Sequence, residues 1–306
     1  MNAITSFISE VRSVDPVEFV RLAGLMALTR GRPDVAVALV DGPVTLDHPD
    51  LATGNIRTLA GGAGACVDIE SASCRHGTFI AGVLAARRGS EAPAIAPDCT
   101  LLIWPIFSEA AAAWQQPSAT PHVLADAIID CVDGGAWILN LSAALTTGGL
   151  GTDRHLREAL DYTVRRGVLV IAAAGNQGAM GGGSPITRHP WIIPVVAYAQ
   201  SGRALAQSNV GRASGLRGVG GPGEGVISLA PEGGSVLSAG TSVAVPFVTG
   251  AAALLWSLFP AATAAEIKNA LLSSHAGRRR TVVPPPLDAW AAYQVLLAGR
   301  VGSAAP

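Results

Sequence analysis

Charged side chains are scarce in this chain of 306 residues. Asp, Glu, Lys and Arg together make up 14%, and aromatic residues make up only 5%. Apolar residues account for 49%, which favours a large buried core and excludes a mostly disordered chain. The net charge is −1, so the composition gives no indication of a nucleic-acid partner or of binding to an anionic membrane.

Cysteine is also infrequent. The four cysteines, Cys66, Cys74, Cys99 and Cys131, do not have the spacing of a metal-binding motif. We expect reduced thiols, as in a cytoplasmic protein. An alternative stays open for Cys66 and Cys74, which flank a short loop just before His76 and have the spacing for a disulfide or redox latch.

The first twenty residues lack the long apolar stretch of a secretory signal, because four charged residues interrupt them (Glu10, Arg12, Asp15 and Glu18). A cytoplasmic location is therefore expected. The segment 243–265 has no charged residue and is long enough to span a membrane, but it contains Pro246, Gly250 and Pro260. A helix buried on all sides explains this segment better, and no membrane partner is expected.

Apolar, β-branched runs alternate with helical patterns along the chain. This alternation predicts an α/β fold, with a central parallel sheet and helices on both faces. The expected strands are Val35–Val40, Thr100–Pro105, Ala136–Leu141, Gly167–Ala172 and Trp191–Val196. The expected helices are Pro16–Leu28, Gly77–Ala86, Pro121–Asp133, Asp153–Arg166, Ser242–Phe259, Ala264–Ser273 and Leu287–Ala298.

Three short motifs place an Asp, a His and a Ser at the edges of buried elements. Asp41 ends an apolar run in Val40-Asp41-Gly42, His76 stands in His76-Gly77-Thr78, and Ser242 stands in Gly240-Thr241-Ser242. A serine hydroxyl needs a neighbouring base to become a nucleophile, and that base needs an orienting carboxylate. We therefore predict Ser242 as nucleophile, His76 as base and Asp41 as its partner.

Each of these residues has rivals in the sequence. Asp47 and Asp50 lie close to Asp41 but in a loop, and Ser228 and Ser238 precede Ser242. The remaining histidines lack the Gly-Thr context of His76. They are His48, His122, His155, His189 and His275.

A fourth residue, Asn176, follows the run Val168–Gly175, which reads as a buried strand ending in small residues. An amide at the end of such a strand can donate a hydrogen bond to a tetrahedral oxyanion. A simple turn at Gly175-Asn176 is the alternative.

These motifs, in this order and with Pro246 after the serine, resemble those of the subtilisin-family serine peptidases. The resemblance runs from about Asp34 to His275. Segments such as Leu39–Val44 and Ile95–Cys99 are similar to segments of the cyanobactin-maturation proteases, which trim ribosomally made peptide precursors. The resemblance implies a subtilisin-like three-layer fold and assigns the oxyanion donor to Asn176.

The resemblance also suggests a domain division and a substrate-binding region. Residues 1–33 are expected to form an N-terminal helical arm, and residues 34–306 a peptidase domain with a Pro-rich link at 278–286 and a last helix at 287–299. Leu141, Ser142, Ala143 and Ala144 resemble the edge strand that pairs with substrate, although Ala144 stands where the family usually has glycine. Ala173, Ala174 and Gly175 are expected to form a second wall. A core role for Ser142 stays open.

The expected function is a serine endopeptidase that removes a leader or tail from a peptide precursor. A broad-specificity intracellular peptidase is the alternative, and a peptide ligase or macrocyclase is a further one. Related macrocyclases carry a helical insertion between Asp and His that shields the acyl-enzyme, and the spacing between Asp41 and His76 leaves no room for it. Hydrolysis is therefore favoured over ring closure, and the expected partner is a peptide substrate.

No cofactor is expected. Many subtilisins bind structural calcium, and Asp68 with Glu70, or Asp47 with Asp50, could supply oxygen ligands. Neither pair forms a recognised calcium loop, so solvated loop charges are the preferred interpretation. The sequence does not indicate the oligomeric state.

Overall fold

The computed structural model describes residues 14–51, 54–62, 64–109, 119–142, 154–178, 184–274 and 281–303. Its centre is a seven-stranded sheet with the strand order β2-β3-β1-β4-β5-β6-β7, in which every neighbouring pair is parallel. The strands are β1 (Ala36–Asp41), β2 (Ile56–Thr58), β3 (Thr100–Pro105), β4 (Ile138–Leu141), β5 (Leu169–Ala173), β6 (Ile193–Tyr198) and β7 (Val219–Pro222). An antiparallel pair, β8 (Val226–Leu229) and β9 (Ser235–Ser238), forms a separate small sheet.

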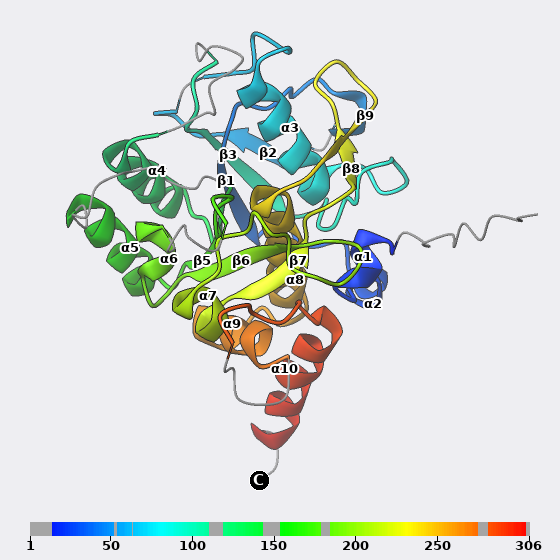
Figure 1. Ribbon diagram of the computed structural model, residues 1–306, viewed down its shortest axis with the longest axis vertical. Helices are drawn as coiled ribbons and strands as arrows, with labels where there is room; N and C mark the ends of the chain where they lie inside the picture. The colour runs from blue at the N-terminus through cyan, green and yellow to red at the C-terminus, as the bar shows by residue number, and fades with distance from the viewer. Residues whose placement is uncertain are drawn as a thin grey trace, which may run out of the picture.

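Helices cover both faces of the large sheet, which confirms the predicted three-layer α/β fold. In Figure 1, α4 and α5 lie side by side in the green part of the chain, and α10 extends away from the sheet. The helices are α1 (Pro16–Phe19), α2 (Ala23–Leu28), α3 (Ala72–Ala85), α4 (Pro121–Asp133), α5 (Arg154–Arg166), α6 (Pro185–Arg188), α7 (Arg212–Arg217), α8 (Thr241–Leu258), α9 (Ala264–Ser273) and α10 (Ala289–Ser303). A 3₁₀ turn, η1, spans Pro49–Leu51.

Both faces of β1 are buried because successive side chains of a strand point in opposite directions. Val37 and Leu39 belong to the core shared with α3 and α8, whereas Ala38 and Val40 belong to the core shared with α4 and α5. This explains why the strands read as nearly continuous apolar runs. The five predicted strands are confirmed with small shifts at their ends, whereas β2, β7, β8 and β9 were not predicted.

The apolar segment that could have been a membrane span is the core helix α8. By length and composition this helix could cross a membrane, but 94% of the apolar window is buried inside the fold. It packs against β4, β5, β6 and β7 and against α3. Its position explains why it carries no charge, since each of its sides contacts other apolar elements.

The expectation of a single helix over Pro16–Leu28 is wrong. The structure has two short helices there, and Arg21 between them adopts a φ of 53°, which a right-handed helix cannot continue through. Leu22 and Leu25 are nevertheless fully buried in the main core. Each buried aliphatic side chain of this kind stabilises a fold by about 1.5–3 kcal/mol, so this part of the chain is held firmly.

Two other helix boundaries differ from expectation. Helix α3 begins at Ala72 rather than at Gly77, because the Ser71 hydroxyl caps it by accepting a hydrogen bond from the backbone N–H of Cys74 at 3.1 Å. Helix α10 extends to Ser303 rather than ending near Ala298. The early start of α3 places His76 inside the helix instead of just before it.

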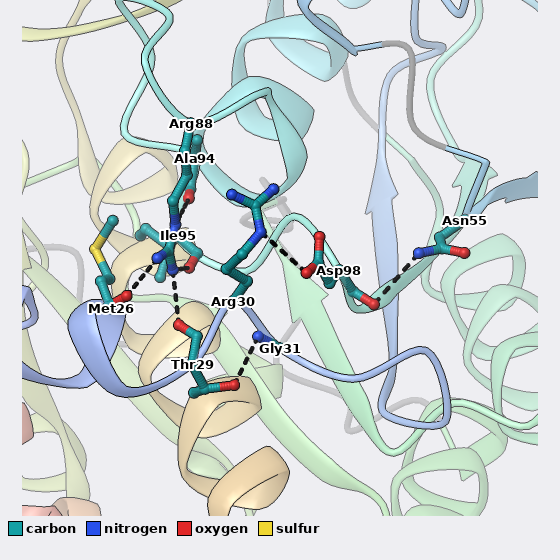
Figure 2. A network of polar contacts seen from close by, with 9 residues as sticks. All are labelled: Met26, Thr29, Arg30, Gly31, Asn55, Arg88, Ala94, Ile95 and Asp98. Carbon is teal, nitrogen blue, oxygen red and sulfur yellow. Dashed lines mark hydrogen bonds and ion pairs between the residues drawn. The ribbon is translucent and has the colours of Figure 1, made fainter.

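The segment after α2 is fastened to the domain by a half-buried arginine, Arg88, just beyond the end of α3 (Figure 2). Its guanidinium donates hydrogen bonds to the carbonyls of Met26, Thr29, Ala94 and Ile95. Burial, together with the nearby charge of Arg30, lowers the pKa of Arg88 from its ordinary value. One side chain therefore satisfies four carbonyls from two separate stretches of the chain.

We predict that Arg88→Met destabilises the protein, because four carbonyls lose a charged donor. Hydrogen bonds to charged groups are each worth about 1.5–3 kcal/mol, and partial rehydration of the carbonyls should leave a net loss of about 2 kcal/mol. The measurement is the urea midpoint, with Arg87→Met as the matched control, since Arg87 is exposed. Equal midpoints for the two variants would show that the network contributes nothing.

Candidate active site

The candidate site lies at the edge of the sheet where the parallel strands end. Asp41 is the last residue of β1, Ser142 follows β4, and Asn176 follows β5 by three residues. Since β1, β4 and β5 are successive neighbours in the sheet, their carboxyl ends meet at one edge. Sequence segments that are far apart are therefore brought together by the topology alone.

Helix α3 approaches the end of β1 at two glycines. A Cβ added to Gly42 would lie 1.9 Å from the carbonyl oxygen of Ser73, and one added to Gly77 would lie 2.4 Å from the carbonyl oxygens of Gly42 and Pro43. No side chain fits at either position without moving backbone. This contact sets the distance between Asp41 and His76.

The structure brings Asp41, His76 and Ser242 into one chain of contacts. His76 Nδ1 lies 2.6 Å from Asp41 Oδ1, and His76 Nε2 lies 2.9 Å from Ser242 Oγ. Asp41 is fully buried and also accepts a hydrogen bond from the backbone N–H of Gly42 at 2.6 Å. The His76 side chain is 30% exposed, so one side of the imidazole remains open to solvent.

The electrostatics of His76 follow from these contacts. Burial lowers the pKa of the imidazole, but the charge of Asp41 and the hydrogen bond to its carboxylate outweigh that effect. The net result is a His76 pKa raised from its ordinary value of 6.5. The carboxylate also selects the tautomer with a proton on Nδ1, which leaves Nε2 to accept the Ser242 proton.

Ser242 stands in the first turn of α8, where backbone N–H groups are not used within the helix. Gly240 precedes the helix with a φ of 136°, a conformation that favours glycine, and a Cβ there would lie 3.3 Å from Asn176 Nδ2. Asn176 Oδ1 accepts hydrogen bonds from the Thr241 backbone N–H at 3.0 Å and the Thr241 hydroxyl at 3.1 Å. The Asn176 oxygen is therefore occupied, and its amide N–H₂ group is the end left to donate.

Sequence reasoning missed Asn209, which holds the backbone on both sides of Asn176. Asn209 is buried, donates its backbone N–H to the Gly175 carbonyl at 2.8 Å and accepts a hydrogen bond from the Gln177 backbone N–H at 2.8 Å. Gly175 has a φ of 104°, and a Cβ there would lie 2.4 Å from Asn209 Nδ2. Asn209 lies in a stretch without a recognisable motif, so the sequence carried no signal for it.

The predicted substrate-binding residues lie along the same edge. Leu141, Ala173, Ala174 and Gly175 are buried, and the Leu141 side chain points into the core with α4 and α5, so only its backbone faces the edge. The buried Asn140 amide donates to Ser142 Oγ at 2.7 Å, while the Thr249 hydroxyl donates to Asn140 Oδ1 at 2.8 Å. Ala143 and Ala144 lie outside the described residues. The binding roles stay predictions.

Cys66 and Cys74 form a disulfide, so the expectation of four reduced thiols is wrong for this pair. Their Cα atoms are 5.5 Å apart, which is within the span that a disulfide requires. Cys99 and Cys131 are free and buried, and burial raises the pKa of the Cys99 thiol to about 11. The disulfide closes the loop that leads into α3, two residues before His76.

The surroundings of the disulfide connect it to both sides of the site. The Thr45 hydroxyl lies 3.3 Å from Cys66 Sγ and 3.4 Å from Cys74 Sγ, and the Thr45 backbone N–H donates to Thr78 Oγ1 at 3.0 Å. Glu109 accepts hydrogen bonds from the backbone N–H groups of Val67 and Asp68. The loop after Asp41 and the loop before His76 are thus joined.

Two groups of His, Cys or carboxylate side chains lie close enough together to share a metal ion within the described part of the chain. They are Cys66-Cys74-Glu109 and His122-Asp126-His155. The sulfurs of the first are bonded to each other, and neither group includes Asp47, Asp50, Asp68 or Glu70. Asp68 instead accepts a hydrogen bond from the Glu70 backbone N–H at 3.0 Å.

Known proteins with similar sequences include a bacterial peptidase. Subtilisin NAT of Bacillus subtilis subsp. natto is 31% identical over 245 residues, a match that covers 79% of this chain and 60% of that protein. The chain thus spans less than two thirds of that relative's length.

Two solved structures are similar over nearly the whole domain. The protease domain of PatA has a TM-score of 0.80 and 30% identity, covering 88% of this chain and 97% of that one. The prenylagaramide maturation protease PagA has a TM-score of 0.77 and 31% identity, covering 90% and 98%. Residues 32–283 match the Subtilase family, peptidase S8, and the chain therefore belongs to that family.

Proposed function

We propose that this protein is a serine endopeptidase that hydrolyses peptide bonds through an acyl-enzyme. One observation carries the proposal, namely the unbroken contact chain from Asp41 through His76 to Ser242, with distances of 2.6 Å and 2.9 Å. Both distances lie within hydrogen-bond reach of a working proton relay. The membership in the subtilase family supports the same reaction class.

In this proposal, His76 Nε2 takes the proton from Ser242 Oγ as the oxygen attacks the scissile carbonyl carbon. Asp41 accepts the Nδ1 proton in a hydrogen bond and stabilises the imidazolium that forms. His76 then gives the proton to the leaving amine, and the acyl group remains on Ser242. A water molecule then loses a proton to His76 as its oxygen attacks the acyl carbon. The bond from that carbon to Ser242 Oγ breaks, Ser242 Oγ takes the proton from His76, and the acid product leaves.

The oxyanion of each tetrahedral intermediate needs donors. The Asn176 amide N–H₂ group and a backbone N–H in the first turn of α8, other than that of Thr241, supply them, and the helix dipole favours negative charge there. Thr241 orients Asn176 by holding its oxygen, so the donor is fixed before substrate arrives. The proposed reaction uses side chains and water and requires no cofactor.

We further propose that the substrate is a peptide precursor from which a leader or tail is removed. PatA is titled a patellamide maturation protease and PagA a prenylagaramide maturation protease, and both are about as similar to this chain as Subtilisin NAT is. Their likeness covers a larger share of the chain than that of Subtilisin NAT. Action in the cytoplasm stays a prediction.

We predict that Ser242→Ala abolishes cleavage of a mixed peptide library, because the nucleophile is gone. A loss of at least about a thousandfold in kcat/KM is expected. Mass spectrometry of the products is the measurement. Clustering of the cut sites around one sequence pattern would support precursor processing, whereas scattered sites would favour a broad peptidase.

Ser238→Ala is the matched control, since Ser238 lies four residues upstream in β9 and outside the contact chain. It should cleave as the unchanged protein does. Cleavage that survives in Ser242→Ala, or that is lost in Ser238→Ala instead, would overturn the assignment. Cyclic or ligated products would point to acyl transfer to an amine in place of hydrolysis.

A pH prediction follows from the raised pKa of His76. The base works only when neutral, so kcat/KM should fall as the pH drops through this pKa, with the midpoint above 6.5. The stabilising charged pair with Asp41 has the opposite dependence. It is fully present below the unfolded pKa and is lost as the pH rises through the folded pKa.

Rates between pH 5 and 9 on a peptide that the library identifies would test this dependence. Asp41→Asn removes the charge that raises the His76 pKa. The acid midpoint of the residual activity should then move down, and kcat should fall because the preferred tautomer is lost. An unchanged midpoint in this variant would show that a group other than His76 sets the acid limb.

The disulfide yields a separate prediction. Replacing Cys66 and Cys74 with serine should lower the free energy of unfolding by about 2–3 kcal/mol, because a short closed loop gains freedom in the unfolded chain. Cleavage at 25 °C should stay within about tenfold of the unchanged protein. The glycine contacts and the Thr45–Thr78 hydrogen bond still hold His76 in place.

Thermal unfolding and kcat/KM with and without dithiothreitol are the measurements. The unchanged protein should respond to the reductant, and the double variant should not. A hundredfold loss of cleavage in a variant that is still folded would mean that the disulfide itself positions His76.

A further inference from the structure

Away from the candidate active site, two imidazoles and a carboxylate converge where α4 and α5 begin. His122 is the second residue of α4 and Asp126 lies four residues later, so both are on one face of that helix. His155 is the second residue of α5, which packs beside α4 (Figure 1). The three side chains thus come from two neighbouring helices of the described fold.

The distances suit a shared metal ion. His122 Nε2 lies 3.7 Å from Asp126 Oδ2, and His155 Nε2 lies 3.0 Å from Asp126 Oδ1. One ligand atom from each residue lies within 4.8 Å of the others. Ligand atoms around a tetrahedral Zn²⁺ with bonds of about 2.0–2.1 Å are about 3.3–3.4 Å apart. The two separations, each to a different oxygen of Asp126, lie on either side of that value.

The chemistry of the three donors narrows the class of ion. Two imidazole nitrogens and one carboxylate oxygen suit Zn²⁺, Co²⁺, Ni²⁺ or Cu²⁺, whereas Ca²⁺ and Mg²⁺ prefer sets made of oxygen alone. All three side chains are partly exposed, so water can complete the coordination. The rings of His122 and His155 lie 4.6 Å apart with an interplanar angle of 31°.

An ion pair between a histidine and an aspartate can form without a second imidazole, as another pair in the same protein shows. His189 Nε2 lies 3.1 Å from Asp161 Oδ1, about the same separation as His155 from Asp126. Within the described part of the chain, no second imidazole lies close enough to His189 and Asp161 to share a metal ion with them. The added feature at α4 and α5 is a second imidazole on the same carboxylate.

We propose that His122, Asp126 and His155 form a binding site for a divalent transition metal of the zinc class. The ion ties the first turn of α4 to the first turn of α5. Along the chain, α5 is the element that follows the segment containing Ala143 and Ala144. The site is independent of the proposed peptidase reaction, and its role is to hold these two helix starts together.

The test is a titration of the metal-free protein with Zn²⁺ by calorimetry at pH 7.5, with Co²⁺ absorption as a second probe. One equivalent should bind, and the thermal midpoint should rise with Zn²⁺. His122→Ala and His155→Ala should each weaken binding at least about tenfold and remove the thermal shift, because each deletes a ligand. His189→Ala is the matched control and should bind Zn²⁺ as the unchanged protein does.

Three results would overturn the proposal. The first is the absence of binding by the unchanged protein, and the second is binding that persists in His122→Ala and in His155→Ala. The third is binding that disappears in His76→Ala but not in His122→Ala, which would place the ion at the candidate active site. Circular dichroism of each variant, including the control at the nearly buried His189, establishes that it is folded.

Discussion

The candidate site depends on one close backbone contact, the approach of α3 to the end of β1 at Gly42 and Gly77. Each glycine lies where a Cβ would be less than 2.5 Å from a backbone oxygen of the other segment. This contact fixes the helix relative to the strand without any side chain between them. Asp41 and His76, each next to one of the glycines, consequently lie 2.6 Å apart.

The remaining parts join this pair through the parallel sheet and the buried helix α8. The sheet brings the ends of β1, β4 and β5 to one edge. Helix α8 begins at that edge and packs against one face of the sheet. A helix without charged residues is stable in this position because apolar side chains of the core surround it. The apolar composition of the chain and the position of Ser242 are therefore two consequences of the same arrangement.

Much of this could be predicted because strand ends and glycine-flanked polar residues leave local signals. Asp41, His76, Ser242 and Asn176 all lie together as expected. What failed depended on backbone detail or on distant partners. Arg21 breaks the predicted N-terminal helix, Asn209 supports Gly175 from a distant stretch without a motif, and the pairing of Cys66 with Cys74 requires their Cα atoms to come close. The cluster of His122, Asp126 and His155 joins two helices, and no local spacing reveals it.

The turn of α3 that carries His76 is held in two ways that differ in chemistry. The glycine contacts act on the backbone and respond neither to reductant nor to pH, whereas the disulfide acts on the loop before the helix and can be reduced. Because the backbone contact lies nearer to the imidazole, it governs the distance to Asp41. The disulfide, with Thr45 and Glu109 around it, constrains the loop that leads into α3. Reduction should therefore act on stability and on the rim of the site before it acts on proton transfer.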